Sequence, residues 1–301
     1  MTMAEETDAF EQVRPDLLRL AYRMTGGRAE AEDIVQDAWL RWNRADTSDV
    51  INPKAWLSRT VARLSIDHLR KVKTRRETYV GPWLPEPVVT DMPTPTPEDP
   101  GHAVELAQDV SLALMSVLET LKPEERAAFL LREAFEMDYS DLASTLGKSE
   151  DACRQMVSRA KIRLRSNRPR FEASDEEHEE LLLAFAAAAQ AGDISTLTRL
   201  LTPNASLTSD GGGKATAALR VVSGAEEVAK LTAHIATNKD AMKGDIEALR
   251  INNRPGFYIT LDGKIEVSYS IDVEEGRIAA LYIMRNPDKL QRLLDPPLGN
   301  A

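Results

Sequence analysis

Apolar residues recur at helical spacing along the first quarter of the chain. In AEAEDIVQDAWLRW, residues 29–42, they repeat at the i, i+3, i+4, i+7 positions of one helix face, namely at Ala31, Ile34, Val35, Ala38 and Trp42. Asn52 and Pro53 then supply an N-cap and a first position for the next helix. Residues 10–75 are therefore predicted to form consecutive helices.

Helical spacing returns in residues 103–166, in about four segments. Within YSDLASTLGKSEDACRQMVSRAKIRLR, residues 139–165, Gly147 ends a short helix and Ser149 is the N-cap of a longer one. This is the layout of a helix-turn-helix. Residues 81–100 contain seven prolines in twenty positions and predict an extended, stiff linker that holds the two helical parts apart.

The pattern changes after EASDEEHEE, residues 172–180. Residues 179–192 and 193–203 are predicted as two helices, and alternating segments follow at 205–210, 244–252 and 256–284. Asp262-Gly263, between two alternating runs, is a strong hairpin signal. The predicted fold is multidomain, with two all-α domains followed by a C-terminal α+β domain, as the length of 301 residues allows.

Cysteine and histidine content argues against a disulfide and against a zinc site. Cys153 is the only cysteine, so no intrachain disulfide can form and a reducing cytoplasm is the expected compartment. The four histidines lie far apart, so no zinc site is predicted. The acidic N-terminal stretch does not look like a secretory signal, and no run of 18 apolar residues predicts a membrane span.

Positive charge is concentrated in two stretches of a chain whose net charge is −10. Residues 54–76 hold eight basic residues and one acidic residue, and residues 148–170 hold eight basic and two acidic. The overall negative charge argues against an anionic partner, but two separate basic stretches within one acidic chain argue for one.

The first basic stretch, placed on a helix, has two apolar sides and a basic strip between them. The strip consists of Trp56, Arg59, Arg63 and Arg70. A basic strip headed by an indole suits a phosphate backbone with a base stacked nearby. A solvated arginine face on a core helix is the alternative that charge alone leaves open.

The second basic stretch forms the longer helix of the helix-turn-helix. Cys153 falls on its apolar face, which indicates a core residue and not a nucleophile. Its polar face carries Asp151, Arg154, Ser158, Lys161 and Arg165. Side chains near its N-terminal half would meet base edges, and Lys161 and Arg165 would meet phosphates. From spacing alone, a purely structural helix pair stays possible.

An acidic patch on the helix of residues 29–42 suggests a protein partner. Asp33, Gln36 and Asp37 surround Leu40, which points away from the apolar face. Single exposed leucines are common. An exposed leucine ringed by acids is also a docking site for a basic protein, whereas DNA would be repelled.

Two segments together resemble a known family. LAYRMTGGRAEAEDIVQDAWLRWNRA and NPKAWLSRTVARLSIDHLRKVKTRR are similar to region 2 of bacterial extracytoplasmic-function (ECF) sigma factors. LKPEERAAFLLREAFEMDYSDLASTLGKSEDACRQMVSRAKIRLR is similar to region 4. Order, spacing and linker all match, over about 150 residues.

The resemblance implies partners and roles for these residues. It implies that Asp33, Gln36, Asp37 and Leu40 dock on the β′ subunit of core RNA polymerase, which binds the protein through its β′ and β subunits. Residues 44–52 would melt and capture the −10 element of promoter DNA, and unwound DNA would contact Trp56, Arg59, Arg63, Arg70 and Lys71. Duplex DNA of the −35 element would meet Arg154, Gln155, Ser158 and Lys161.

The remaining chain resembles a SnoaL-like domain of the NTF2 cone fold, as in the ECF group that carries such a fused domain. Three short motifs support this: WLPEP at 83–87, DGGGK at 210–214 and NPDKL at 286–290. The resemblance implies that the fused domain controls activity in cis, with no separate anti-sigma factor. We expect the motifs to meet at one regulatory interface made by Trp83, Leu84, Pro85, Asp210, Gly211, Gly212, Gly213, Lys214, Asn286, Pro287, Asp288, Lys289 and Leu290.

The expected domains are a region 2 domain (1–78), a proline-rich linker (79–106), a region 4 domain (107–170) and a SnoaL-like domain (175–295). We expect no catalytic residue, metal or cofactor, while an unknown small-molecule ligand of the SnoaL-like domain stays possible. Two alternatives are a sensor–enzyme fusion, with Asp210 and His234 as acid–base candidates, and a helix-turn-helix repressor.

Overall fold

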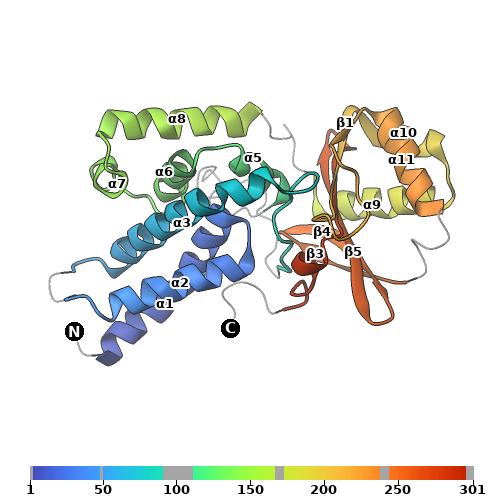
Figure 1. The fold of residues 1–301 in the computed structure, drawn as a ribbon. Helices are drawn as coiled ribbons and strands as arrows, with labels where there is room; N and C mark the ends of the chain where they lie inside the picture. Colours follow the sequence, from blue (N-terminus) through green and yellow to red (C-terminus); the bar gives the residue numbers. More distant parts are fainter. Residues whose placement is uncertain (1–2, 48–49, 91–110, 167–172, 238–243, 296–301) are drawn as a thin grey trace.

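The computed structural model describes residues 3–47, 50–90, 111–166, 173–237 and 244–295, apart from the side chains of 3–5, 73–77 and 165–166. Figure 1 shows a helical half and a half built on a β-sheet, with the short red helix α12 between them. Residues 91–106 of the expected linker lie outside the described residues.

The helical half contains both predicted helical segments. Its elements are α1 (Met3–Thr25), α2 (Arg28–Trp42), α3 (Pro53–Glu77), α5 (Leu112–Glu119), α6 (Pro123–Ala134), α7 (Tyr139–Leu146) and α8 (Glu150–Ser166). One hydrophobic cluster runs from Phe10 in α1 to Leu164 in α8, so the two segments share a single core. The expectation of two basic surfaces held apart by the linker is therefore wrong for this structure, because α3 packs directly on α6 and α7.

The second half is a six-stranded sheet covered on one face by helices. The strands are β1 (Leu201–Asp210), β2 (Val222–Ser223), β3 (Asp245–Ile251), β4 (Arg254–Leu261), β5 (Lys264–Glu274) and β6 (Arg277–Met284), in the order β2-β1-β6-β5-β4-β3. Only the β1–β6 pair among these described strands is parallel. The covering helices are α9 (Asp175–Gln190), α10 (Ile194–Leu200) and α11 (Ala225–Thr237), and they share a core with the sheet.

The opposite face of the sheet packs on the linker and on α12 (Pro287–Leu290). Side chains alternate across β6, so Leu281 and Ile283 join the helix-covered core while Met284 points to the other side. There Met284 contacts a smaller cluster with Leu84 of the linker and Leu290 of α12. The sheet is thus sandwiched between its own helices and the linker.

Local signals placed several boundaries correctly and one incorrectly. The Asp262-Gly263 hairpin is present, with φ values of 52° and 75° between β4 and β5. The helix predicted to reach residue 203 ends at Leu200, and β1 begins at Leu201. Pairing with Ile278 of β6 draws Leu201 into the sheet, although its local pattern is helical.

His178 gives the C-terminal half a pH-dependent stability. Burial lowers the pKa of this α9 side chain to about 4, and nearby Arg254 and Arg250 act in the same direction, against a hydrogen bond to the backbone carbonyl of Ile271 and the charge of Asp175. The neutral ring is therefore favoured in the folded protein, and its contribution is complete above pH 6.5, the ordinary value. As the pH falls from 6.5 to 4, we expect about 3 kcal/mol of stability to be lost.

Calorimetric unfolding of the full chain and of His178→Gln, from pH 7.5 to pH 4, measures this loss. The unmodified protein should lose about 3 kcal/mol more than the variant, since glutamine does not titrate. Parallel pH curves for the two proteins would contradict the assignment.

Candidate nucleic-acid interface and linker clamp

The basic strip of α3 lies against α6 and α7 of the same chain. The Arg59 guanidinium is 3.0 Å from a carboxylate oxygen of Asp141 in α7. Arg63 donates to the carbonyl oxygens of Ser144 and Thr145, each at 3.0 Å. These carbonyls belong to the last turn of α7, where a cation complements the negative end of the helix.

A second arginine makes the reciprocal contact. Arg126 of α6 is buried and donates to the carbonyl oxygen of Met24, in the last turn of α1, at 2.5 Å, and it also pairs with Glu119 at 2.7 Å. Further along α3, Arg70 is 2.6 Å from Glu124 of α6. The two helical regions therefore cap one another's helix ends with arginine.

Two other predicted contacts on α3 differ in exposure. Trp56 is partly buried against the shared core, and its ring meets Trp42 edge-on at a centroid distance of 5.2 Å. Lys71 is exposed. Helical spacing alone placed Trp56 in the basic strip. In this conformation its indole instead packs at the margin of the core, where it completes an apolar side of α3.

The helix-turn-helix is formed as its sequence predicts. Gly147 ends α7 in the left-handed region, with φ of 63°, where a Cβ would cost conformational energy. The Ser149 hydroxyl accepts a hydrogen bond from the amide of Ala152 at 3.2 Å and so caps α8. Cys153 is buried on the face of α8 that packs on the core.

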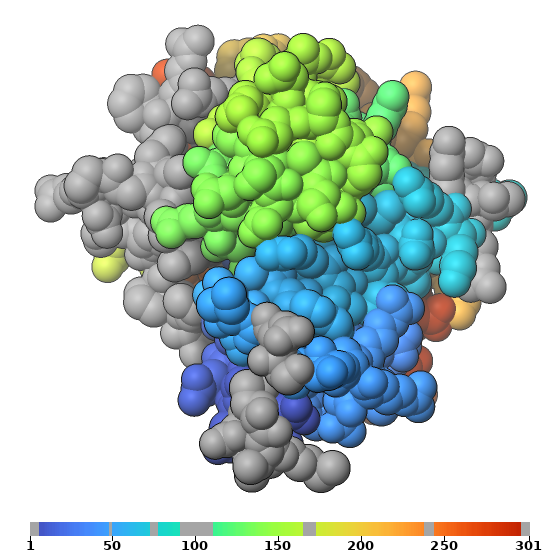
Figure 2. Space-filling model, turned by 90° about the vertical axis from the view of Figure 1, so that its left-hand side faces the viewer, coloured from blue at the N-terminus to red at the C-terminus, as the bar shows by residue number. Residues whose placement is uncertain are grey.

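The predicted −35 contacts occupy the outer face of α8. Arg154 pairs with Glu150 at 2.6 Å and lies over the Tyr139 ring, and Gln155 accepts a hydrogen bond from Arg159. Ser158 is exposed, while Lys161 pairs with Glu133 at 2.8 Å. The Arg165 side chain lies outside the described residues. Figure 2 shows α7 and α8, in yellow-green, directly above α3, in blue to cyan, on one face of the molecule.

The predicted polymerase patch on α2 is open to solvent. Asp33, Gln36 and Asp37 are exposed, and 41% of the Leu40 surface is accessible. Glu32 beside this patch pairs with Arg292 of the C-terminal segment at 2.9 Å. The structure thus keeps the four residues together on one accessible surface.

A buried carboxylate joins the linker to the C-terminal half. Asp210, at the end of β1, has no accessible surface, yet both of its oxygens have donors. One oxygen accepts from the Tyr79 hydroxyl at 2.6 Å and from the Gly212 amide at 3.0 Å. The other accepts from the Leu84 amide at 2.8 Å and from the Lys289 ammonium at 2.7 Å. Burial, together with the bond to Asp210, raises the pKa of Tyr79.

Lys289 brings the NPDKL motif to the same point. Its ammonium donates to the Leu84 carbonyl and lies 4.2 Å from the centre of the Trp83 ring, a cation–π distance. Asn286 caps α12 and donates to the Tyr79 hydroxyl at 2.9 Å. The neighbouring pair of Lys214 and Asp288, at 2.5 Å, is exposed. We call this assembly around Asp210 the linker clamp.

The other side of the linker contacts the turn between α1 and α2. A Cβ at Gly26 would lie 2.4 Å from the Trp83 ring, so only glycine admits the indole at this α1–α2 turn. Pro85 and Glu86 are buried, and the Glu86 amide donates to the Gly26 carbonyl while its carboxylate accepts from the Arg28 amide at 2.8 Å. The linker is thus bonded to both halves at once.

Family models and relatives agree with these features. The Sigma-70 region 2 model matches residues 9–76, and the Sigma-70 region 4 model matches residues 111–164. The chain is 39% identical over 294 residues to the ECF RNA polymerase sigma factor SigJ of Mycobacterium tuberculosis, covering 94% of this chain and 93% of that one. The chain belongs to the ECF sigma factors.

Two further comparisons extend this result. A probable ECF RNA polymerase sigma factor, SigI of Mycobacterium tuberculosis, is 34% identical over 198 residues, 65% of this chain and 66% of SigI. The crystal structure of SigJ matches with a TM-score of 0.71 at 37% identity, and covers 94% of this chain and 97% of that one. The predicted fold class is confirmed in its main parts: two all-α sigma regions are followed by a C-terminal α+β domain.

Sequence reasoning missed several residues that hold this sigma factor together. Tyr22 of α1 donates to the Glu86 carbonyl at 2.7 Å and accepts from Asn252 at 2.7 Å. The Asn252 backbone amide also donates to the Val88 carbonyl at 2.8 Å, and the Asn252 side-chain oxygen accepts from the Val88 amide at 3.1 Å. The Asn252-Asn253 pair, both at positive φ, signals a turn between strands, but no local pattern says which distant segment that turn meets.

The structure separates the two acid–base candidates of the enzyme alternative. Asp210 faces the linker clamp, whereas His234 is exposed at the rim of a cavity on the helix-covered face of the sheet. Among the described residues no helix is long and apolar enough to cross a bilayer, and no group of three or more metal-ligand side chains is gathered.

Proposed function

We propose that this sigma factor directs core RNA polymerase to −10 and −35 promoter elements and initiates transcription in the cytoplasm. The observation that carries the proposal is that the chain has two basic helices, α3 and α8, and also an accessible acidic patch on α2. The patch would dock on the β′ subunit, and the helices would bind DNA through their basic faces.

In this proposal the conformation with α3 packed on α6 and α7 is a closed state of the protein. Arg59, Arg63 and Arg70 are bonded to α6 and α7, so promoter DNA would compete with these bonds for the three guanidinium groups. The two promoter elements lie apart on DNA, which also requires regions 2 and 4 to separate. Polymerase binding would supply the free energy for this opening by favouring the open state.

The C-terminal domain would control this opening in cis. Its linker clamp fixes the segment that leads from region 2 to region 4, since Asp210 and Lys289 hold Leu84 while Glu86 binds the α1–α2 turn. The domain would then take the place of a separate anti-sigma factor. No catalytic role is assigned to it.

Transcription in vitro with core polymerase tests the proposal. The full chain, a chain ending at Arg170 and a chain ending at Asp288 are compared on a promoter library. Initiation by the full chain supports sigma activity, and a changed activity of either shorter chain supports control in cis. If none of the three initiates on any promoter, the sigma assignment is wrong.

Asp141→Arg should favour the open state. It places a second positive charge beside Arg59 without altering a residue proposed to bind DNA. Both side chains of the original pair are about a third to a half exposed, so we expect the closed state to lose about 1 kcal/mol of stability. This loss corresponds to roughly a fivefold rise in affinity for a single-stranded −10 oligonucleotide. Asp138→Arg adds the same charge at an exposed site of the same turn and is the matched control. Equal affinities of the two variants would argue against a closed resting state.

A further inference from the structure

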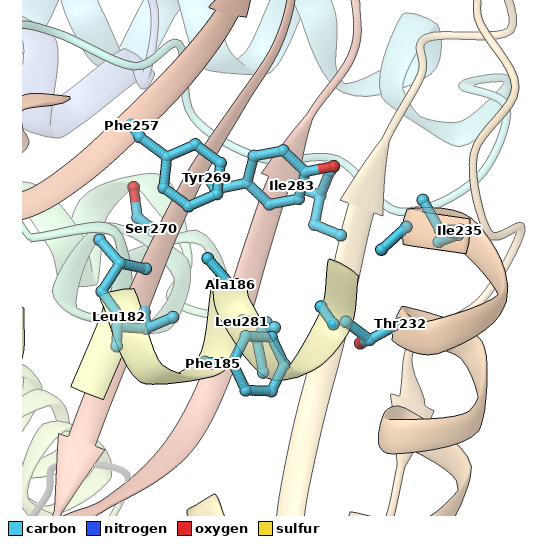
Figure 3. Close-up of a pocket in the computed structure, with 13 residues that line it drawn as sticks. Leu182, Phe185, Ala186, Thr232, Ile235, Phe257, Tyr269, Ser270, Leu281 and Ile283 are labelled. Carbon is cyan, nitrogen blue, oxygen red and sulfur yellow. The ribbon is translucent and has the colours of Figure 1, made fainter. Parts of the chain in front are cut away.

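The helix-covered face of the C-terminal sheet encloses a two-chambered cavity. The outer chamber, about 350 Å³, lies between α11 and the sheet, and its size is within the usual range of small-molecule sites. A smaller inner chamber of about 40 Å³ continues toward α9. Ile235, Tyr269 and Ile283 line both chambers. Figure 3 shows these side chains around the inner space, with Thr232 and Ile235 on α11 opposite the sheet.

One buried hydroxyl in this cavity lacks a protein partner among the described residues. The Thr232 hydroxyl is buried and has no hydrogen bond within the part of the chain that the structure describes. Tyr269 stacks on Phe257 at a centroid distance of 4.6 Å, and burial raises the pKa of its hydroxyl. A buried hydroxyl without a partner loses the hydrogen bonds it makes in water, which a ligand can restore.

Arg285 determines which charge the outer chamber favours. Arg285 lines the chamber, and its guanidinium donates to the Thr216 carbonyl at 2.8 Å, which leaves other N–H groups available among the described contacts. Glu266, the acidic residue on the described lining, is exposed, so water screens it more than the half-buried Arg285. The chamber thus combines apolar walls with one cation.

We propose that this cavity binds a small amphipathic ligand with an apolar ring body and an anionic oxygen group. The body fills the outer chamber, with an edge against Tyr269 and Ile235, and the anionic group binds Arg285. A hydroxyl or carbonyl on the ligand reaches the hydroxyl of Thr232 or Tyr269.

The ligand would also act on the linker clamp, and this part rests on the proposed function. Ser209 and Arg285 line the cavity and directly precede Asp210 and Asn286 of the clamp. The loop after β1 has Thr216 and Ala217 on the cavity side, while Gly212 lies against Asn286. A ligand that orders this loop therefore stabilises the clamp, because both share the same backbone.

Two fluorescent probes test the site in the full chain. 8-Anilinonaphthalene-1-sulfonate has apolar rings and a sulfonate, and N-phenyl-1-naphthylamine is its uncharged counterpart. Ile235→Trp, which fills the junction of the chambers, should lower the affinity for both probes at least tenfold. Leu183→Trp, on the exposed side of α9, is the matched control and should leave both affinities unchanged. Binding that Ile235→Trp does not weaken, or no saturable binding, overturns the site.

Arg285→Gln separates the charge from the apolar contact. It should weaken the sulfonate probe about fivefold to tenfold and leave the uncharged probe unchanged. Equal effects on the two probes would remove the anion from the proposed ligand class.

Hydrogen exchange tests the coupling to the clamp. Saturation with the sulfonate probe should slow exchange of the amides of Leu84, Glu86 and Val88 at least threefold, and an unchanged or faster rate overturns the coupling. Failure to initiate transcription would refute the proposed function and leave probe binding intact. Absent probe binding with normal transcription would refute only the ligand site.

Discussion

Lys289→Met should loosen the linker clamp by about 3 kcal/mol. Asp210 has no accessible surface, and Lys289 is its cationic partner, so the substitution leaves a buried carboxylate without a counter-charge. This loss corresponds to roughly a hundredfold faster exchange of the Leu84 amide, which donates to Asp210. Hydrogen exchange followed by mass spectrometry on the full chain measures it.

Lys214→Met is the matched control for this experiment. Lys214 binds Asp288 next to the clamp, but both side chains are more than half exposed, so the pair contributes at most about 1 kcal/mol. The control should leave exchange at Leu84 nearly unchanged. If the two variants exchange alike, Lys289 does not hold the linker. Asp210→Asn combined with Lys289→Met should recover part of the loss, because it removes the unpaired charge.

Asp37→Arg combined with Leu40→Ala should weaken binding to core polymerase at least about thirtyfold. Leu40 exposes 41% of its surface among acidic side chains, so the double change removes an apolar anchor and reverses a neighbouring charge. Each change at the centre of an interface typically costs about 1–2 kcal/mol or more. Titration of core polymerase with labelled protein gives the dissociation constant.

The chain offers a control with the same spacing. Glu180→Arg combined with Leu183→Ala alters an exposed acid and an exposed leucine three positions apart on α9. This pair should bind polymerase like the unmodified protein. Weakening by both double variants would point to general loss of charge balance, and weakening by neither would refute the α2 patch as the docking surface.

Local patterns predicted the helices and the hairpin because their determinants lie within a few residues. Gly147 and Ser149 form the turn of the helix-turn-helix, and Asp262-Gly263 forms the tight loop, each by its own backbone chemistry. The polar residues around Leu40 were likewise placed on one open surface by helical periodicity alone.

Long-range contacts could not be predicted in the same way. Helical spacing put Arg63 on a polar strip, but the partner that the strip meets, the end of α7, is 81 residues away. Trp56 was assigned to that strip, whereas contact with Trp42 draws it to the core margin. The three regulatory motifs were named through family resemblance, and the residues that join them to region 2, such as Tyr22 and Asn252, carry no local signal.

The exchange of arginine caps between α1, α3, α6 and α7 has a consequence for a cell full of DNA. A chromosome offers millions of non-specific sites, and affinity for them grows with the number of cations that can release counterions from phosphates. Arginines already bonded to carbonyls and carboxylates of their own chain have little of that capacity. In the proposed closed state, Arg59, Arg63 and Arg70 would therefore contribute less to non-specific binding than they would after regions 2 and 4 separate.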